Sequence, residues 1–252
     1  MYPLPASSLL LAGFPLLAGC LIVLVALGHR VAAARLGVDG RVALRRTLLF
    51  LVIAVLWQAV VSGLAMKGVL ANFDAKPPRI LFLLVSIAGG AQVLARSTFG
   101  KTLSDGLPLA ALVGFQAFRL PLELLMHAAA NEGVMPEQMT YTGWNFDIVT
   151  GASAVVVAVL VALGVGGRRL VLAWNALGTA LLVSIVVIAI SSTPVFAAFG
   201  EGAALNTFIA YVPFTTLPTV MVLLAMAGHV VVWRKLLGER TAVAQAPVVS
   251  AA

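Results

Sequence analysis

The sequence predicts an all-α fold, a polytopic bundle of seven transmembrane helices with the N-terminus outside and the C-terminus in the cytoplasm. Three observations lead to this prediction: the composition, the lengths of the apolar segments and the distribution of basic residues between them. Of the 252 residues, 62% are hydrophobic and 10% are charged, and the mean hydropathy is +1.08. Soluble domains are about 45–50% apolar and about 25% charged, so a soluble globular enzyme is excluded.

The apolar segments define the predicted helices in order. A helix needs about 20 predominantly apolar residues to cross a bilayer, and long unbroken apolar runs do not alternate with the period of two that strands require. No loop is long enough for a soluble domain, so residues 1–252 are predicted to form a single transmembrane domain. The seven segments are 9–28, 47–66, 80–95, 107–130, 147–165, 170–192 and 207–233.

Basic residues gather on one side of these seven spans. If successive spans alternate in direction, twelve Lys and Arg residues fall on one side and three on the other. Cytoplasmic loops carry the excess of basic residues, which gives the predicted orientation. The net charge of +7 then reflects topology, and no basic tract indicates nucleic acid as a partner. The basic side holds Arg30, Arg35, Arg41, Arg45, Arg46, Arg96, Lys101, Arg168, Arg169, Arg234, Lys235 and Arg240, and the other side holds Lys67, Lys76 and Arg79.

The fourth segment carries ionisable side chains within its apolar sequence. Arg119, Glu123 and His127 are four residues apart, and Gln116 lies three residues before Arg119. This spacing places all four on one helix face, and Pro121 is expected to kink the helix. Ionisable groups in a span cost about 2.5–3.5 kcal/mol each and usually face the bundle interior. The stripe predicts either a ligand cavity or pathway, or an Arg119–Glu123 pair that only fixes helix packing.

Asn145 and Asp147 stand at the start of the fifth segment. An antiparallel neighbour of the fourth segment would bring Asp147 to the depth of His127. Such a carboxylate–imidazole pair could hold a proton, fix a tautomer or bind a cation. Alternatively, Asn145 or Asp147 only caps the helix.

Weaker polar positions occur in the last two segments. Asn175 lies in the sixth, and Thr215 and Thr216 lie between Pro213 and Pro218 in the seventh. Two prolines five residues apart predict a bent or broken helix, which transporters use to expose backbone to a ligand. The alternative is a kinked structural helix in which threonine hydroxyls bond back to carbonyls.

The sequence predicts no cofactor and no metal site. The last segment has no lysine for a retinal Schiff base, and no H-E-x-x-H, Walker-type, G-x-S-x-G or C-x-x-C pattern occurs. His29 and His229 fall at predicted cytoplasmic helix ends. Two haem ligands could stand there, but solvated interface histidines are the commoner case, and we expect the latter.

Part of the chain resembles a group of small multi-pass bacterial membrane proteins that carry no assigned activity. The resemblance rests on FRLPLELLMH at 118–127, MT at 139–140, GWNFDI at 143–148, WNALG at 174–178 and LP at 217–218. It covers about residues 110–233, and the first three segments contribute nothing to it. It implies a bacterial inner-membrane location and transfers no functional residues.

These patterns predict a membrane protein that transports or binds a small polar or ionic ligand in a polar pocket of its outer half. Arg119 would contact an anionic or polar group, and Glu123, His127 and Asp147 would be proton or cation partners. One alternative is a membrane-embedded enzyme that uses these groups as acid and base on a lipid or quinone head group. Another is a sensor or accessory subunit. Expected partners are the lipid bilayer, the ligand, and a second copy or membrane partner subunit.

Overall fold

The computed structural model describes residues 6–244, with side chains described for residues 6–238. The described part of the chain is helical and contains no strand, which confirms the predicted all-α class. The α-helices are α1 (Ser8–Arg35), α2 (Gly40–Met66), α3 (Arg79–Arg96), α4 (Thr98–Gly106), α5 (Leu109–Phe115), α6 (Arg119–Asn131), α7 (Ile148–Ala162), α8 (Arg168–Ser191) and α9 (Leu223–Ala244). Shorter helical segments are η1 (Gln116–Phe118), η2 (Glu137–Met139), η3 (Phe208–Ala210) and the π-helical η4 (Leu217–Val222).

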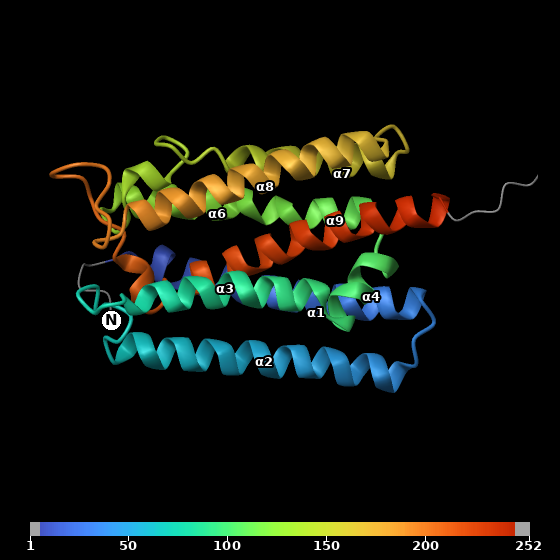
Figure 1. Cartoon of the computed structure of the whole chain (residues 1–252), viewed down its shortest axis with the longest axis horizontal. Coiled ribbons are helices and arrows are strands. Elements are labelled where there is room, and N and C mark those ends of the chain that lie inside the picture. The colour runs from blue at the N-terminus through green and yellow to red at the C-terminus, as the bar shows by residue number, and fades with distance from the viewer. Residues whose placement is uncertain (1–5, 245–252) are drawn as a thin grey trace, which may run out of the picture.

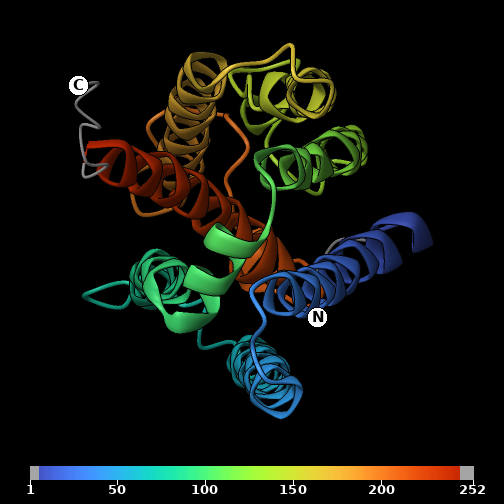
Figure 2. The same cartoon turned by 90° about the vertical axis from the view of Figure 1, so that its right-hand side faces the viewer.

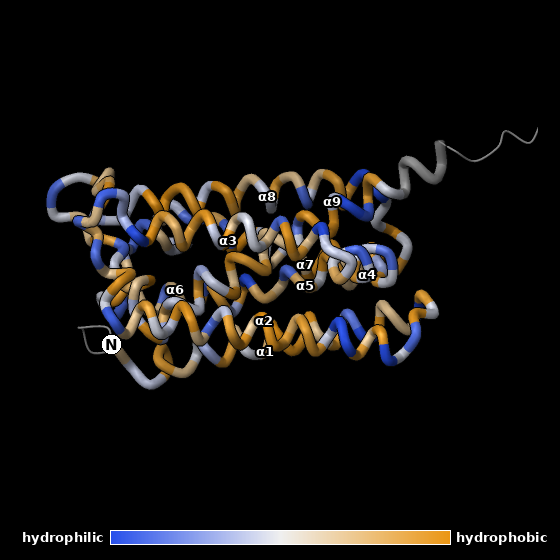
Figure 3. The backbone as a smooth tube through the Cα atoms, turned by 60° about the horizontal axis from the view of Figure 1, so that its bottom comes forward, coloured by the Kyte–Doolittle hydropathy of each residue, from blue (hydrophilic) through white to orange (hydrophobic). Residues whose placement is uncertain are grey.

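Six helical segments among the described residues are long and apolar enough to cross a membrane. They are Ser8–Arg35, Gly40–Met66, Arg79–Arg96, Leu109–Asn131, Arg168–Ser191 and Leu217–Gly238. The remaining predicted span corresponds to α7, which has only 15 residues and is therefore about 22 Å long at 1.5 Å per residue. Hydrophobic residues run along the helices, and hydrophilic residues collect toward the two ends (Figure 3). The chain is a multi-pass helical membrane protein.

The bundle has two ends, which we name the Ser8 end and the Arg35 end after the first and last residues of α1. Successive long helices alternate in direction (Figure 1), and α7 runs alongside α8. The connections 67–78, 132–147 and 192–216 therefore gather at the Ser8 end. The connections 36–39 and 163–167 lie at the Arg35 end together with α4.

Helix α9 occupies the middle of the bundle. It packs on α3, α4, α5 and α8, whereas α2 packs chiefly on α1 at the periphery. Seen along the bundle, α9 runs obliquely (Figure 2): it lies near the centre at the Ser8 end and reaches the periphery between α3 and α8 at the Arg35 end. Because of this tilt, α9 lies between α3 and α8 at the Arg35 end but not at the Ser8 end.

The fourth predicted span is interrupted in its middle. Helix α5 ends at Phe115, the 3-10 turn η1 follows, and α6 begins at Arg119. Pro121 is the third residue of α6, where it cannot donate a backbone hydrogen bond to the preceding turn. The expected kink is thus a short change of helix type, and it lies directly before the charged residues.

The seventh predicted span begins ten residues later than expected. Residues 207–216 form η3 and turns, and the helix starts with η4 at Leu217. Pro213 and Pro218 lack the backbone N–H that a continuous helix needs. The Thr216 hydroxyl instead donates to the Pro213 carbonyl at 2.8 Å. The prediction of a broken helix holds here, but the helical start at 207 was wrong.

Helix α4 stands where the sequence predicts only a connection. Ser97 caps it by accepting from the Gly100 N–H at 3.2 Å. Gly100 packs so tightly on the last turn of α3 that a side chain would collide with the Ala95 carbonyl. Arg234 of α9 donates to the same carbonyl at 2.7 Å and so ties the α3–α4 corner to the bundle. The side chain of Arg240 lies outside the described residues.

Candidate functional site

Arg119 and Asp147 form a buried ion pair between α6 and α7. Arg119 Nη1 donates to Asp147 Oδ1 at 2.6 Å, and the two residues are 1% and 5% exposed. Arg119 is the first residue of α6, and Asp147 is the residue before α7. The helices approach closely because Gly151 lacks a side chain: a Cβ there would lie 2.6 Å from the Leu120 backbone nitrogen.

Glu123 is held by the amide of Asn145. Asn145 Nδ2 donates to both carboxylate oxygens of Glu123, at 2.8 and 2.9 Å, and to the carbonyl of Met139 at 3.0 Å. Asn145 Oδ1 accepts from the Asp147 backbone N–H at 3.0 Å. Through Asn145 the two acidic residues therefore belong to one network, which we call the Arg119 network: Arg119, Glu123, Asn145 and Asp147.

The pairing differs from the sequence-based expectation at two points. Arg119 pairs with Asp147 and not with Glu123, so the charges are matched across helices. His127 is half-buried and packs on Tyr141, with ring centroids 4.7 Å apart. No ion pair among the described residues joins His127 to Asp147. Asp147 precedes α7 but makes no side-chain capping hydrogen bond, because its carboxylate is used by Arg119.

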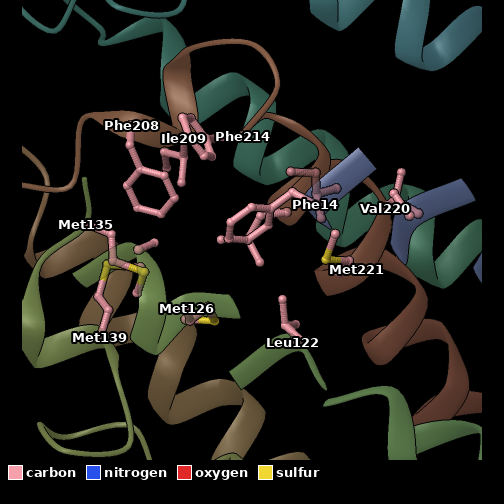
Figure 4. Packing of buried hydrophobic residues seen from close by; sticks show 14 of the residues in the cluster. Phe14, Leu122, Met126, Met135, Met139, Phe208, Ile209, Phe214, Val220 and Met221 are labelled. Atoms are coloured by element: carbon pink, nitrogen blue, oxygen red, sulfur yellow. The ribbon is translucent and has the colours of Figure 1, made fainter. Parts of the chain in front are cut away.

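A cavity of about 410 Å³ lies beside the Arg119 network. Arg119, Glu123 and Asp147 form part of its wall, Thr193 and Asn206 are the other polar residues lining it, and the rest of the lining is apolar. The apolar part comes from α3, α6, α8 and the η4–α9 helix. Methionines contribute to it from four different elements: Met126 of α6, Met139 of η2, Met221 of η4 and Met226 of α9. Figure 4 shows the first three. Such flexible side chains adapt to irregular partners.

The cavity reaches the flank of the bundle between α3 and α8. Val85 in its wall is 71% exposed, and the lining residues Val186 and Ile190 of α8 are only half-buried. In this region α9 lies near the bundle centre and not between α3 and α8 (Figure 2). In a membrane, such a flank faces lipid.

Two donor groups of Arg119 remain unused. Its Nε and Nη2 are buried and have no hydrogen-bond partner. Leaving a buried donor unsatisfied costs about 1–3 kcal/mol, and more for a charged group. Since Arg119 lines the cavity, an acceptor inside the cavity could satisfy these donors.

The secondary residues expected from the sequence lie elsewhere. Gln116 and Asn175 are fully buried and bond to the backbone of α9: Gln116 donates to the Ala225 carbonyl and Asn175 donates to the His229 carbonyl. Thr215 is buried beneath the Ser8 end, and its hydroxyl has no partner. Thr216 bonds locally to the preceding turn. None of these four lines the cavity beside the Arg119 network.

Both histidines that the sequence placed at a solvated interface are buried, so that expectation was wrong. His29 is 0% exposed: its ring stacks on Phe99 of α4, and its Nδ1 lies 2.9 Å from the Thr47 hydroxyl. His229 is 1% exposed and contacts Asn175 of α8. The two rings face different sets of helices and do not form the facing pair that a haem would need.

The fold and the cavity together define a class: a multi-pass helical membrane protein with a buried charged network at a laterally open apolar cavity. Within the described residues, no group of three His, Cys, Asp or Glu side chains is arranged to share a metal ion. Comparison with protein-family models, curated proteins and solved structures finds no match for this chain.

Proposed function

We propose that this chain binds a membrane-soluble amphiphile, with its head group at Arg119 and its apolar body in the cavity between α3 and α8. One observation carries the proposal: Arg119 is 1% exposed, yet its Nε and Nη2 lack partners at the cavity wall. The sequence led us to expect a small polar or ionic ligand. We now propose that this polar group is the head group of a larger, amphiphilic ligand.

The unpaired donors favour a head group with acceptor oxygens. A guanidinium presents its N–H groups as a planar fork that matches carboxylate or phosphate oxygens. One arm of the Arg119 fork is already held by Asp147 at 2.6 Å, which fixes its orientation. The remaining Nε–H and Nη2–H groups can then donate hydrogen bonds to two oxygens of one head group.

The remaining cavity wall favours an apolar body. A volume of about 410 Å³ lies within the range of about 300–1,000 Å³ for small-molecule sites. A small ion would leave the apolar lining of α3 and α8 unused. An amphiphile would fill it, entering through the flank without leaving the bilayer.

A membrane-embedded enzyme acting on a lipid or quinone head group is the second candidate, and the lateral opening favours it. Its acid and base were expected to come from Glu123, His127 and Asp147. His127 instead packs on Tyr141 and does not line the cavity. Binding or transport of the amphiphile therefore has more support than chemistry on it.

We also propose a seven-span topology with the Ser8 end outside, in a bacterial inner membrane. The alternating helix directions and the twelve basic residues predicted for one side support it, as does the resemblance noted for about residues 110–233. Helix α7 is short for a span. However, the connection before it is also buried, at Met135, Met139 and Asn145, and we propose that this connection and α7 cross the membrane together. In a Cys20→Ala background, cysteine at Glu201 should react with an impermeant maleimide in intact cells, and cysteine at Gly37 should not. The reverse pattern would refute the orientation.

Photolabelling tests the binding proposal. A long-chain fatty acid with a mid-chain diazirine should label α3 and α8 in the protein reconstituted in nanodiscs. Arg119→Lys can keep the ion pair with Asp147 but loses the planar fork. We expect labelling affinity to fall about tenfold or more, since a charge-assisted hydrogen bond contributes about 1.5–3 kcal/mol.

Controls separate the head-group contact from folding. Arg169→Gln removes an exposed arginine at the Arg35 end and should leave labelling unchanged. Competition by unlabelled oleate and by lysophosphatidic acid distinguishes carboxylate from phosphate heads. Equal labelling of the wild type and a folded Arg119→Lys variant would refute the proposal.

A further inference from the structure

A second buried polar cluster lies deeper in the bundle than the Arg119 network. Gln116 of η1, Thr150 of α7, Asn175 of α8 and His229 of α9 are each at most 1% exposed. We call these four residues the His229 cluster. They come from four different elements, and the cavity lining described above includes none of them.

The hydrogen bonds of Asn175 fix the state of the His229 ring. Asn175 Nδ2 donates to the His229 carbonyl at 3.3 Å, which orients the amide. Asn175 Oδ1 must then accept from His229 Nδ1, 2.7 Å away. In a neutral imidazole with its proton on Nδ1, the other nitrogen is an acceptor. His229 Nε2 therefore offers a lone pair to its surroundings.

Three polar atoms of the cluster have no hydrogen-bond partner: His229 Nε2, Thr150 Oγ1 and Gln116 Oε1. Gly178 of α8 lets two of the side chains pack together. A Cβ on Gly178 would lie 2.7 Å from His229 Cε1, 3.2 Å from His229 Nε2 and 2.8 Å from the methyl carbon Cγ2 of Thr150. The His229 ring and the Thr150 side chain thus meet at the same glycine. A water molecule can donate to His229 Nε2 and pair with the Thr150 hydroxyl, which are the two functions that these groups lack.

We propose that the His229 cluster binds internal water and extends the polar path from the Arg119 network toward the Arg35 end. Buried waters typically make about three hydrogen bonds to otherwise unsatisfied groups, and the cluster offers three. Thr150 provides the link, because it lies one turn into α7 from Asp147 and its backbone N–H donates to the Asp147 carbonyl at 2.9 Å. The resulting order is Arg119, Asp147, Thr150, water and His229. The path does not depend on the ligand proposed above.

Water-edited solid-state NMR of the protein in bilayers, with ¹⁵N-labelled histidine, tests this path. The chain has only three histidines, so single variants assign the signals. We expect His229 Nε2 to receive magnetisation from water although the residue is buried. In Thr150→Val, the transfer should fall by about a third or more, since one of about three hydrogen bonds to the water is lost.

Thr47→Val is the matched control. Thr47 is also buried and stands 2.9 Å from a histidine nitrogen, that of His29. This variant should change the His29 signal and leave the transfer to His229 intact. Absence of transfer to His229 in the wild type, with half-buried His127 giving a normal signal, would overturn the water site. Unchanged transfer in Thr150→Val would overturn the link through Thr150.

Discussion

Replacing Gly151 with alanine tests the close approach that holds the Arg119–Asp147 pair. A Cβ at this position would lie 2.6 Å from the Leu120 nitrogen and 3.0 Å from Arg119 Cβ. Ordinary van der Waals contact starts at 3.4 Å, so α7 would have to move away from the start of α6. The obstructing atoms are backbone and a Cβ, which cannot rotate aside. The same movement would lengthen the ion pair, because Asp147 directly precedes α7.

The size of the effect follows from two opposing terms. Overpacking of a well-packed interior costs about 1–3 kcal/mol, whereas replacing a mid-helix glycine with alanine gains about 0.5–1 kcal/mol. Gly89→Ala in α3 is a matched control, since nothing lies within 4 Å of its added Cβ. Both variants replace a helical glycine with alanine, so the gain in helix propensity is the same in both and cancels when they are compared. Their stabilities should therefore differ by about 1–3 kcal/mol, with Gly151→Ala the less stable.

Thermal unfolding in nanodiscs, followed by the fluorescence of the four tryptophans, measures this difference. For chains of 150–250 residues, 1 kcal/mol shifts Tm by about 2–4 °C, so the two variants should be about 2–12 °C apart. Gly151→Ala should also weaken photolabelling, because it displaces Asp147 from Arg119. Equal melting temperatures for the two variants would refute the proposed helix contact.

Three further substitutions probe other parts of the fold. Asn145→Ala should destabilise the protein by about 1–3 kcal/mol, since it leaves the Glu123 carboxylate buried without its amide donor. Arg234→Gln should cost about 1.5–3 kcal/mol, because it removes a charge-assisted hydrogen bond to the Ala95 carbonyl. Lys101→Ala removes an exposed ion pair within α4 and should change stability by less than about 0.5 kcal/mol. Each is checked by the same thermal unfolding measurement.

Controls for these substitutions come from the exposed surface. Asn131→Ala and Arg169→Gln change the same residue types at exposed positions and should leave Tm close to that of the wild type. Should Asn145→Ala melt like Asn131→Ala, the amide would not stabilise Glu123. An Arg234→Gln variant as stable as Arg169→Gln would show that the α3–α4 corner holds without this bond.

The sequence predicted the residues of the Arg119 network but not all of their partners. The i, i+4 spacing correctly placed Arg119 and Glu123 on a buried face. It could not show how connection 132–147 folds at the Ser8 end. There Asn145 bonds back to the Met139 carbonyl, and Asp147 pairs with Arg119 instead of His127. The fold of an irregular connection such as 132–147 produces no periodic pattern in the sequence.

The position of His229 was missed for a different reason. A helix beginning at residue 207 would place His229 about 33 Å along its axis, at the far membrane surface, at 1.5 Å per residue. The helix begins at Leu217, so His229 lies about 18 Å along it, near mid-membrane. Pro213 and Pro218 signalled a break but not its extent. His29 was placed correctly along α1, and it is buried because the unpredicted α4 brings Phe99 over its ring.

The short length of α7 connects the two polar regions. With about 22 Å of helix, α7 begins inside the bundle, so the residue before it, Asp147, can reach Arg119 in the interior. Asp147 therefore offsets the burial of the Arg119 charge. One turn later, Thr150 borders the His229 ring at Gly178. A full-length helix in place of α7 would carry both Asp147 and Thr150 out toward the Ser8 surface and separate the two regions.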